Sequence, residues 1–131
     1  MCGLLLCVLG CGPEGAPRHE VTGVVRVDGA PAERVLVQLV NENEATSGDD
    51  RYPLGLTDST GRFRIGSQAN QPGAIEGSYR VLFSWLSSPD LDAVDRLEGR
   101  YADPATATDR MVRVPTDGEL SFELTTAKQR R

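Results

Sequence analysis

The sequence predicts an all-β domain, a seven-stranded Greek-key β-sandwich, and three observations carry this prediction. Apolar and polar residues alternate with a period of two in seven short segments of the chain. Clusters of Asp, Gly, Pro and Ser, which favour turns, separate these segments. No segment keeps the helical period of about 3.6 residues for three turns. Seven short strands in a chain of 131 residues match the count of a Greek-key sandwich.

The predicted strands follow one another through short polar connections. The first ends at the turn Asp28-Gly29, a dipeptide that is typical of hairpins. The fourth follows a hairpin turn at 57–61, in which Asp58 can bond the backbone and Gly61 can adopt a positive φ. The expected strands are 21–27, 35–40, 54–56, 63–65, 79–85, 111–114 and 120–124, with a turn at 115–118 joining the last two.

The segment 79–85 is the clearest strand. Its alternation places Tyr79, Val81, Phe83 and Trp85 on one face and Arg80 on the other. Aromatic residues make up only 5% of the chain, so this face should hold much of its bulky apolar surface. We therefore expect it to pack against a second sheet in the interior.

One short helix is expected near 89–97. Ser88 can cap it, and Pro89 suits the first helical position. Asp90, Asp92 and Asp95 would then fall in its first turns, where the helix dipole favours negative charge.

The same three aspartates, with Asp58, could instead offer oxygen ligands to calcium. The segment that begins at Asp58 lacks the downstream acidic residue of an EF-hand loop, and Asp and Gly are ordinary turn residues. We therefore expect no metal site and no cofactor.

Composition limits the classes of function. There are 14 Lys and Arg against 19 Asp and Glu, a net charge of −5, which argues against nucleic acid as a partner. The three cysteines, Cys2, Cys7 and Cys11, all lie within the first eleven residues. The sequence therefore predicts neither a disulfide framework nor a zinc site.

The N-terminus reads as a targeting segment. Residues 1–10 are apolar and uncharged, too short for a membrane span of about 20 residues, and fit a secretory signal peptide. Val8-Leu9-Gly10-Cys11 resembles a bacterial lipobox. That resemblance implies cleavage after Gly10 and a diacylglyceryl group on Cys11; the alternative is a buried N-terminal strand. The predicted divisions are signal peptide 1–10, lipidated Cys11 with tether 11–18, β-sandwich 19–126 and basic tail 127–131.

Four segments, in order along the chain, resemble a known family. They are VTGVVRVDGAPAERVLVQLV at 21–40, GLTDSTGRFRIG at 55–66, GAIEGSYRVLFSW at 73–85 and RYADPATATDRMVRVPTDGELSFELT at 100–125. Together they look like the carboxypeptidase-regulatory-like (transthyretin/prealbumin-like) domain, most closely the short secreted lipoproteins of planctomycete bacteria. The resemblance implies the sandwich fold and no particular activity. Ala107 departs from the family pattern, which often has Ser there.

The sequence gives no sign of catalysis. His19 is the only histidine, and it lies beside the tether, away from any serine or cysteine in a nucleophile motif. Some transthyretin-fold proteins hydrolyse 5-hydroxyisourate, but they need several histidines and a C-terminal Tyr-Arg-Gly-Ser. This chain ends Lys-Gln-Arg-Arg. We expect no catalytic residue.

Two groups of residues are candidates for recognition. The acidic loop with Glu42, Glu44, Asp49 and Asp50 is either a solvated loop or part of a recognition surface. Tyr79 and Trp85 could form a carbohydrate platform, but their shared strand face favours core packing. Tyr101 lies outside that strand and is therefore the better candidate for an exposed aromatic residue.

The predicted function is that of a non-enzymatic, lipid-anchored module of the cell envelope, facing the periplasm or the exterior. Its partners would be the membrane, through lipidated Cys11, and an envelope protein or glycan. The alternative is an accessory lipoprotein that binds a small ligand or carbohydrate.

Overall fold

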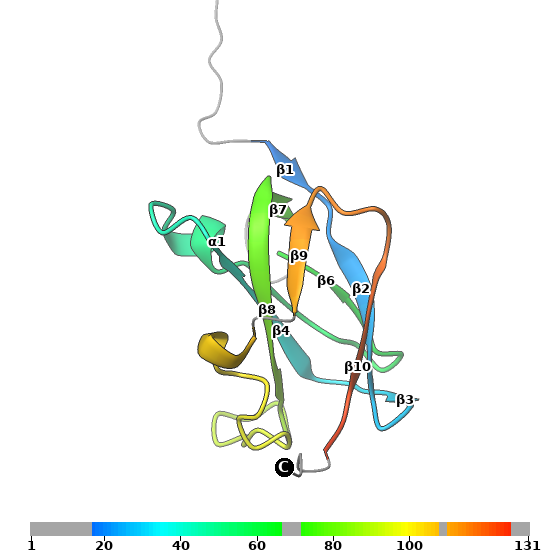
Figure 1. Ribbon diagram of the computed structural model, residues 1–131. Coiled ribbons are helices and arrows are strands. Elements are labelled where there is room, and N and C mark those ends of the chain that lie inside the picture. Colours follow the sequence, from blue (N-terminus) through cyan, green and yellow to red (C-terminus); the bar gives the residue numbers. More distant parts are fainter. Residues whose placement is uncertain (1–16, 67–71, 108–109, 127–131) are drawn as a thin grey trace, which may run out of the picture.

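The computed structural model describes residues 17–66, 72–107 and 110–126, and their fold is all-β (Figure 1). This confirms the all-β class that the sequence predicts. Two four-stranded sheets form the body, and a two-stranded sheet, β1–β7, closes one end. The first main sheet has the order β10-β2-β3, with β6 also paired to β2, and the second has the order β5-β4-β8-β9.

The longer strands coincide with the segments that alternate in the sequence. Their bounds are β2 Thr22–Val27, β4 Val35–Asn41, β5 Leu54–Leu56, β6 Arg62–Arg64, β8 Gly77–Trp85, β9 Met111–Val114 and β10 Leu120–Leu124. Three strands of two residues were not predicted: β1 Arg18–His19, β3 Ala30–Pro31 and β7 Ala74–Ile75. Two single-turn helices, α1 Gly48–Arg51 and the 3₁₀ turn η1 Pro104–Thr106, lie in connections.

The last two strands belong to different sheets. β9 pairs antiparallel with β8, whereas β10 pairs parallel with β2, so that Phe122 is opposite Val25. The predicted turn at 115–118 therefore carries the chain from one sheet to the other and does not close a hairpin.

The core lies between the two main sheets. Along β4, buried and half-buried residues alternate strictly, which places Val35, Val37 and Leu39 inside. From the neighbouring β8, Phe83 meets Phe122 of β10 with ring centroids 5.0 Å apart, so the two sheets are in direct aromatic contact. Gly23 of β2 leaves room for this packing, because a Cβ there would lie 2.6 Å from the ring of Phe63.

The predicted helix at 89–97 is absent. The segment forms turns and one isolated bridge between Leu86 and Asp95. The Asp95 carboxylate accepts hydrogen bonds from the backbone N–H groups of Trp85, Leu97 and Gly99. Together with the complete burial of Leu97, these bonds fix the segment as a loop and outweigh the local capping signal.

The predictions for the N-terminal segment and the tail concern residues outside those that the structure describes. These are the signal peptide 1–10, Cys11 and the basic tail 127–131. Arg18, which was assigned to the tether, belongs to β1. None of the helices in the described part of the chain has the length and apolar character to cross a bilayer.

Candidate functional site

A groove of about 330 Å³ crosses the outer face of the second sheet and is the best candidate for a functional site. Its floor comes from β4 and β8. Alternation turns Gln38 and Val40 outward from β4, and Arg80 and Leu82 outward from β8. The register places Arg80 beside Val40 and Leu82 beside Gln38, so the floor is a compact patch of two apolar and two polar side chains.

The two walls come from long connections. The β4–β5 connection supplies Glu42, Glu44, Arg51 and Tyr52, and the β8–β9 connection supplies Pro104. In Figure 1 these connections, with α1 and η1, lie on the same side of the second sheet. The rim is thus built on loops, and a rigid sheet positions them.

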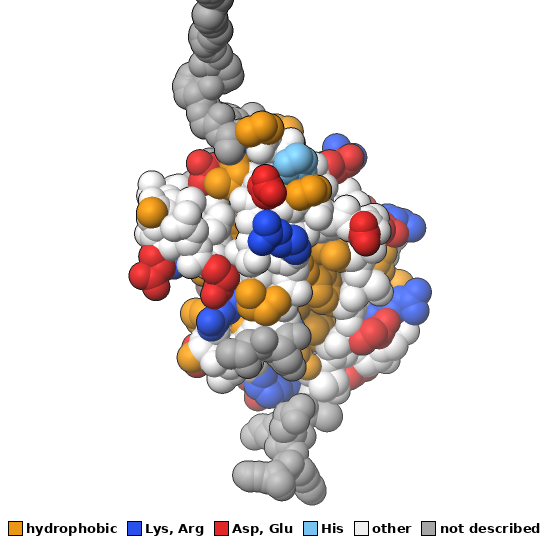
Figure 2. Space-filling view, turned by 45° about the horizontal axis from the view of Figure 1, so that its top comes forward, with side chains coloured by type: hydrophobic (Ala, Val, Ile, Leu, Met, Phe, Trp, Pro, Cys, Tyr) orange, Lys and Arg blue, Asp and Glu red, His pale blue; other side chains and the backbone are white. Residues whose placement is uncertain are grey.

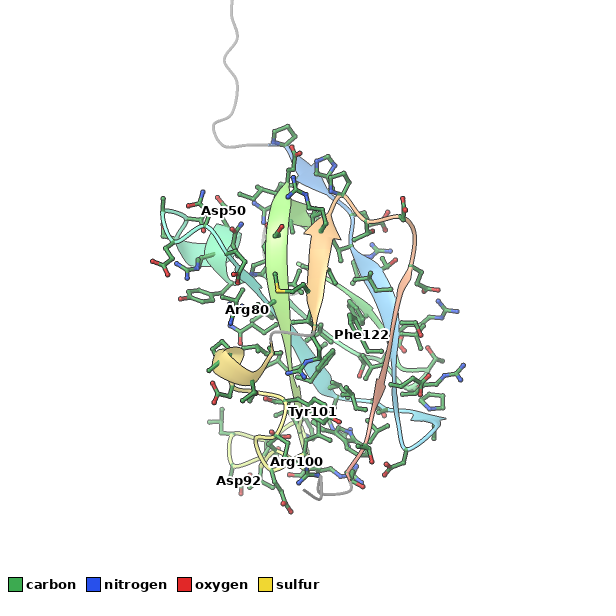
Figure 3. The ribbon with its side chains drawn as sticks, viewed as in Figure 1. Asp50, Arg80, Asp92, Arg100, Tyr101 and Phe122 are labelled. Atoms are coloured by element: carbon green, nitrogen blue, oxygen red, sulfur yellow. The ribbon has the colours of Figure 1, made fainter. Side chains whose placement is uncertain are left out.

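Arg80 ties the two walls together. Its Nε lies 2.9 Å from the carboxylate of Glu42, and its Nη1 donates a hydrogen bond of 2.7 Å to the carbonyl of Pro104. The side chain points from β8 toward the side of the molecule that carries these loops (Figure 3). The guanidinium therefore links the two walls and helps to fix the distance between them.

Arg51 is held differently. Its guanidinium lies over the ring of Tyr52, 5.4 Å from the centroid. It makes no ion pair within the described part of the chain, and its buried Nε has no hydrogen-bond acceptor there. The groove therefore contains a cation whose Nε–H has no acceptor among the residues that the structure describes.

The structure brings part of the predicted acidic surface into this groove. Glu42 and Glu44 line it. Asp50 does not, because it pairs with Arg18 of β1 at 2.7 Å. Asp49 lies in α1, with its side chain outside the described set.

The groove's exposed aromatic residue, Tyr52, was missed by the sequence analysis. It is 46% exposed. A tyrosine in a polar, charged connection, outside any alternating segment, was the signal that could have found it.

Tyr79 and Trp85, which the sequence suggested as a possible carbohydrate platform, do not line the groove. Tyr79 is fully buried, as predicted; burial raises its pKa, and its hydroxyl donates to the carbonyl of Ile75 at 2.6 Å. Trp85, predicted to be in the core, is only partly buried at its margin. Arg96 lies 3.5 Å from the centre of the Trp85 ring, and the indole N–H donates to the carbonyl of Glu33.

The prediction that Tyr101 is an exposed aromatic residue is wrong. Its ring packs against the core edge-to-face with Phe83, centroids 6.3 Å apart, and its hydroxyl accepts a hydrogen bond from the backbone N–H of Thr125. The β8–β9 connection, in which it lies, folds back along β8, where the backbone N–H of Phe83 donates to the carbonyl of Tyr101. The long-range contact decides the burial, and no local pattern encodes it.

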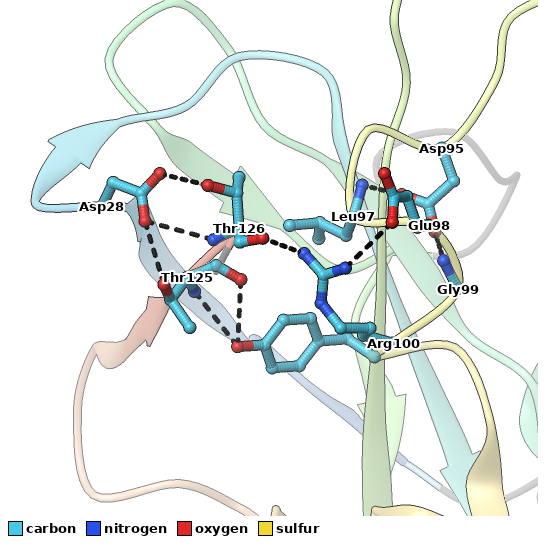
Figure 4. Close-up of polar contacts among 9 residues, drawn as sticks. Asp28, Asp95, Leu97, Glu98, Gly99, Arg100, Thr125 and Thr126 are labelled. Carbon is cyan, nitrogen blue, oxygen red and sulfur yellow. Dashed lines mark hydrogen bonds and ion pairs between the residues drawn. The ribbon is translucent and has the colours of Figure 1, made fainter. Parts of the chain in front are cut away.

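The remaining acidic residues serve turns and junctions. Asp58 accepts from the backbone N–H and hydroxyl of Thr60, and these bonds lower the pKa of the carboxyl group. Asp28 accepts from both groups of Thr126 and from the Thr125 hydroxyl, which joins the β2–β3 turn to the end of β10 (Figure 4). Among the described residues, no group of three or more His, Cys, Asp or Glu could hold a metal ion.

Two other hollows are less suited to a ligand. One, of about 460 Å³, lies beside β6, but its Arg62 already pairs with Glu119 and its Asp58 is committed to the turn. The other, of about 300 Å³, is lined by Glu20, Arg64, Pro72 and Gly73. Acidic and basic side chains are mixed over the face in Figure 2, without a broad basic patch.

The groove on the second sheet offers the chemistry of carboxylates, guanidinium groups, an amide and a phenol. Its lining residues include no serine, cysteine or histidine. His19 lies on β1, opposite Ala74 in the small end sheet. Comparisons of the chain with protein-family models, curated proteins and solved structures gave no match.

Proposed function

We propose that this chain is a non-enzymatic binding module of the cell envelope, held to a membrane by a lipid on Cys11. The observation that carries the binding role is the groove on the second sheet, which has a floor of apolar and polar side chains, an exposed tyrosine, and an arginine without an acidic partner among the described residues. A concave site with an apolar base and a few convergent polar groups is typical of ligand recognition.

The lipobox-like Val8-Leu9-Gly10-Cys11 supports the anchor. From Cys11 to Arg18 the chain has seven steps, so its maximal reach is about 25 Å. Arg18 then fixes where the domain begins, since it pairs with Asp50 and donates to the carbonyls of Pro72 and Gly73. A lipid on Cys11 would hold the β1–β7 end of the domain near the membrane and leave the groove on its flank.

We also propose the finer fold assignment, a Greek-key sandwich of the carboxypeptidase-regulatory-like type. The four sequence segments that resemble that family support it, because they include the longer strands of both main sheets. The fold itself implies no activity, so the function rests on the groove.

A second candidate is an accessory lipoprotein for a small ligand. The volume of about 330 Å³ favours it, since it falls at the lower end of the range for small-molecule sites. Both candidates use the same groove and differ in the size of what occupies it.

Metabolic labelling with a fatty acid, followed by membrane fractionation, tests the anchor. The parent should be labelled and membrane-bound, and Cys11→Ser should be unlabelled and released. Cys7→Ser is the matched control and should behave as the parent does. Label that persists in Cys11→Ser would overturn the assignment.

A further inference from the structure

We propose that the groove binds a sugar that carries a carboxylate, with the sugar ring on Tyr52 and the carboxylate on Arg51. This inference rests on the proposed binding function and names its ligand class. Three features of the groove lead to it: an exposed aromatic surface, a guanidinium without an acidic partner among the described residues, and acceptor groups on the same rim.

Tyr52 provides the aromatic surface. It is 46% exposed although it adjoins the apolar floor residues Val40 and Leu82. Exposed aromatic rings beside an apolar base suit a ligand with one flat, weakly polar face and polar edges, as a pyranose has.

Arg51 provides the charge for the carboxylate. Its neighbour in the groove, Arg80, is neutralised by Glu42 at 2.9 Å, whereas Arg51 pairs with no acid in the described part of the chain. The Arg51 guanidinium makes no hydrogen bond or ion pair with another described residue, so its terminal N–H groups have no protein acceptor there. A guanidinium binds a carboxylate through two parallel N–H···O bonds, so a carboxylate fits this position best.

Glu44 and Gln38 provide for hydroxyl groups. A sugar hydroxyl both donates and accepts, so one ring can donate to the Glu44 carboxylate and exchange hydrogen bonds with the Gln38 amide. Glu42 and Glu44 would repel a ligand that carries several negative charges on one ring. The mixed rim therefore favours a hydroxyl-rich ligand with a single carboxylate per ring.

Two sources share this chemistry, uronic acid chains and the lactyl group of N-acetylmuramic acid. Calorimetry with the purified full chain separates them, with oligogalacturonate, a GlcNAc–MurNAc disaccharide, and a neutral galacto-oligosaccharide of the length of the uronate as probes. We expect one carboxylated probe to bind with a Kd at least about tenfold lower than that of the neutral sugar. The probe that binds identifies the source.

Variants then assign the contacts. Arg51→Gln should remove the preference for the carboxylate, and Tyr52→Ala should weaken binding of charged and neutral sugars alike, by about tenfold. Tyr52→Phe keeps the ring and should bind as the parent does. Arg64→Gln, an exposed arginine on the first sheet, is the matched control and should change nothing.

The comparison of charged and neutral sugars on the parent needs no variant, so the test survives even where a substitution unfolds the chain. Absence of binding by every probe, equal affinity for charged and neutral sugars, or a preference retained in Arg51→Gln would each overturn the inference. None of these results bears on the labelling of Cys11, so a failure here is distinct from a failure of the anchor.

Discussion

Arg18 and Asp50, which are 32 positions apart in the chain, form an ion pair of 2.7 Å that joins β1 to α1. The arginine side chain is 17% exposed and also donates to the carbonyls of Pro72 and Gly73. One side chain thus connects the point where the chain enters the domain to the connection that forms a wall of the groove.

The first prediction concerns this junction. Asp50→Asn should leave overall stability nearly unchanged, because partly exposed ion pairs contribute only about 0–1 kcal/mol. It should increase amide hydrogen exchange at the paired β1 and β7 strands and in the nearby α1 connection. Glu20→Gln is the control, since its pair with Arg64 is long, 3.8 Å, and exposed. Unchanged exchange in Asp50→Asn would show that the pair has no such role.

The second prediction concerns the core of β8. Phe83 is 1% exposed and contacts Phe122 and Tyr101. Phe83→Ala should cost about 3–5 kcal/mol, a large part of the roughly 5–15 kcal/mol of a domain of this kind. Chemical denaturation measures this loss.

The control for Phe83 is best taken from the other face of the same strand. Arg80 is unsuitable because it pairs with Glu42 and bonds Pro104. Ser84 faces outward from β8 and is half-buried, so Ser84→Ala should cost about 0.5 kcal/mol or less. Similar losses for Phe83→Ala and Ser84→Ala would contradict the assignment of faces.

The third prediction concerns Asp95, which organises the loop in place of the expected helix. Asp95→Ala leaves the N–H groups of Trp85, Leu97 and Gly99 without their acceptor and should cost about 1–3 kcal/mol. Trp85 is the only tryptophan of the chain, so its fluorescence reports directly on this loop. An emission spectrum identical to the parent's, together with an unchanged melt, would count against the role.

The fourth prediction is a pH dependence. Hydrogen bonds from Thr126 and Thr125 lower the pKa of Asp28 below its ordinary value of 3.8. A carboxyl whose pKa is depressed by folding stabilises the fold above its unfolded pKa and ceases to do so as the pH falls through its folded pKa. Asp28→Ala should therefore lower the melting temperature at pH 7. The difference from the parent should shrink as the pH falls below about 3.8.

Melting curves of the parent and of Asp28→Ala, recorded from pH 7 to below pH 3.8, test this pH dependence. Asp58 also has a lowered pKa and is unchanged in both proteins, so the acid sensitivity that it contributes cancels in the comparison. A difference between the two proteins that stays constant down to the lowest pH would refute the linkage.

The alternation of β4 and β8 was readable from the sequence because it depends on neighbouring residues alone. A residue and its second neighbour lie on the same face of a strand, so the inward direction of Val35, Val37, Tyr79 and Phe83 follows from spacing. The turn at Asp58 was readable for the same reason, since its acceptor and donors lie within four residues.

The groove could be predicted from the sequence only in part. The sequence marked Glu42 and Glu44 as a candidate surface but not Tyr52, and it could not show which residues of β8 lie beneath the loop. That neighbourhood depends on the pairing of β4 with β8, and strand partners are selected by packing across distant parts of the chain.

The sequence by itself determined the fold class, the positions of the longer strands, the faces of those strands and the lipobox-like segment at Cys11. The tertiary structure alone decided that β10 runs parallel to β2, that 89–97 is a loop, that Tyr101 is packed and that Arg51 and Tyr52 border a groove. The physical reason is that these features depend on contacts between residues far apart in the chain, whereas the sequence pattern reports only on neighbouring residues. A capping signal such as Ser88-Pro89 is worth about 1 kcal/mol, and the burial of Leu97 with the three bonds to Asp95 outweighs it.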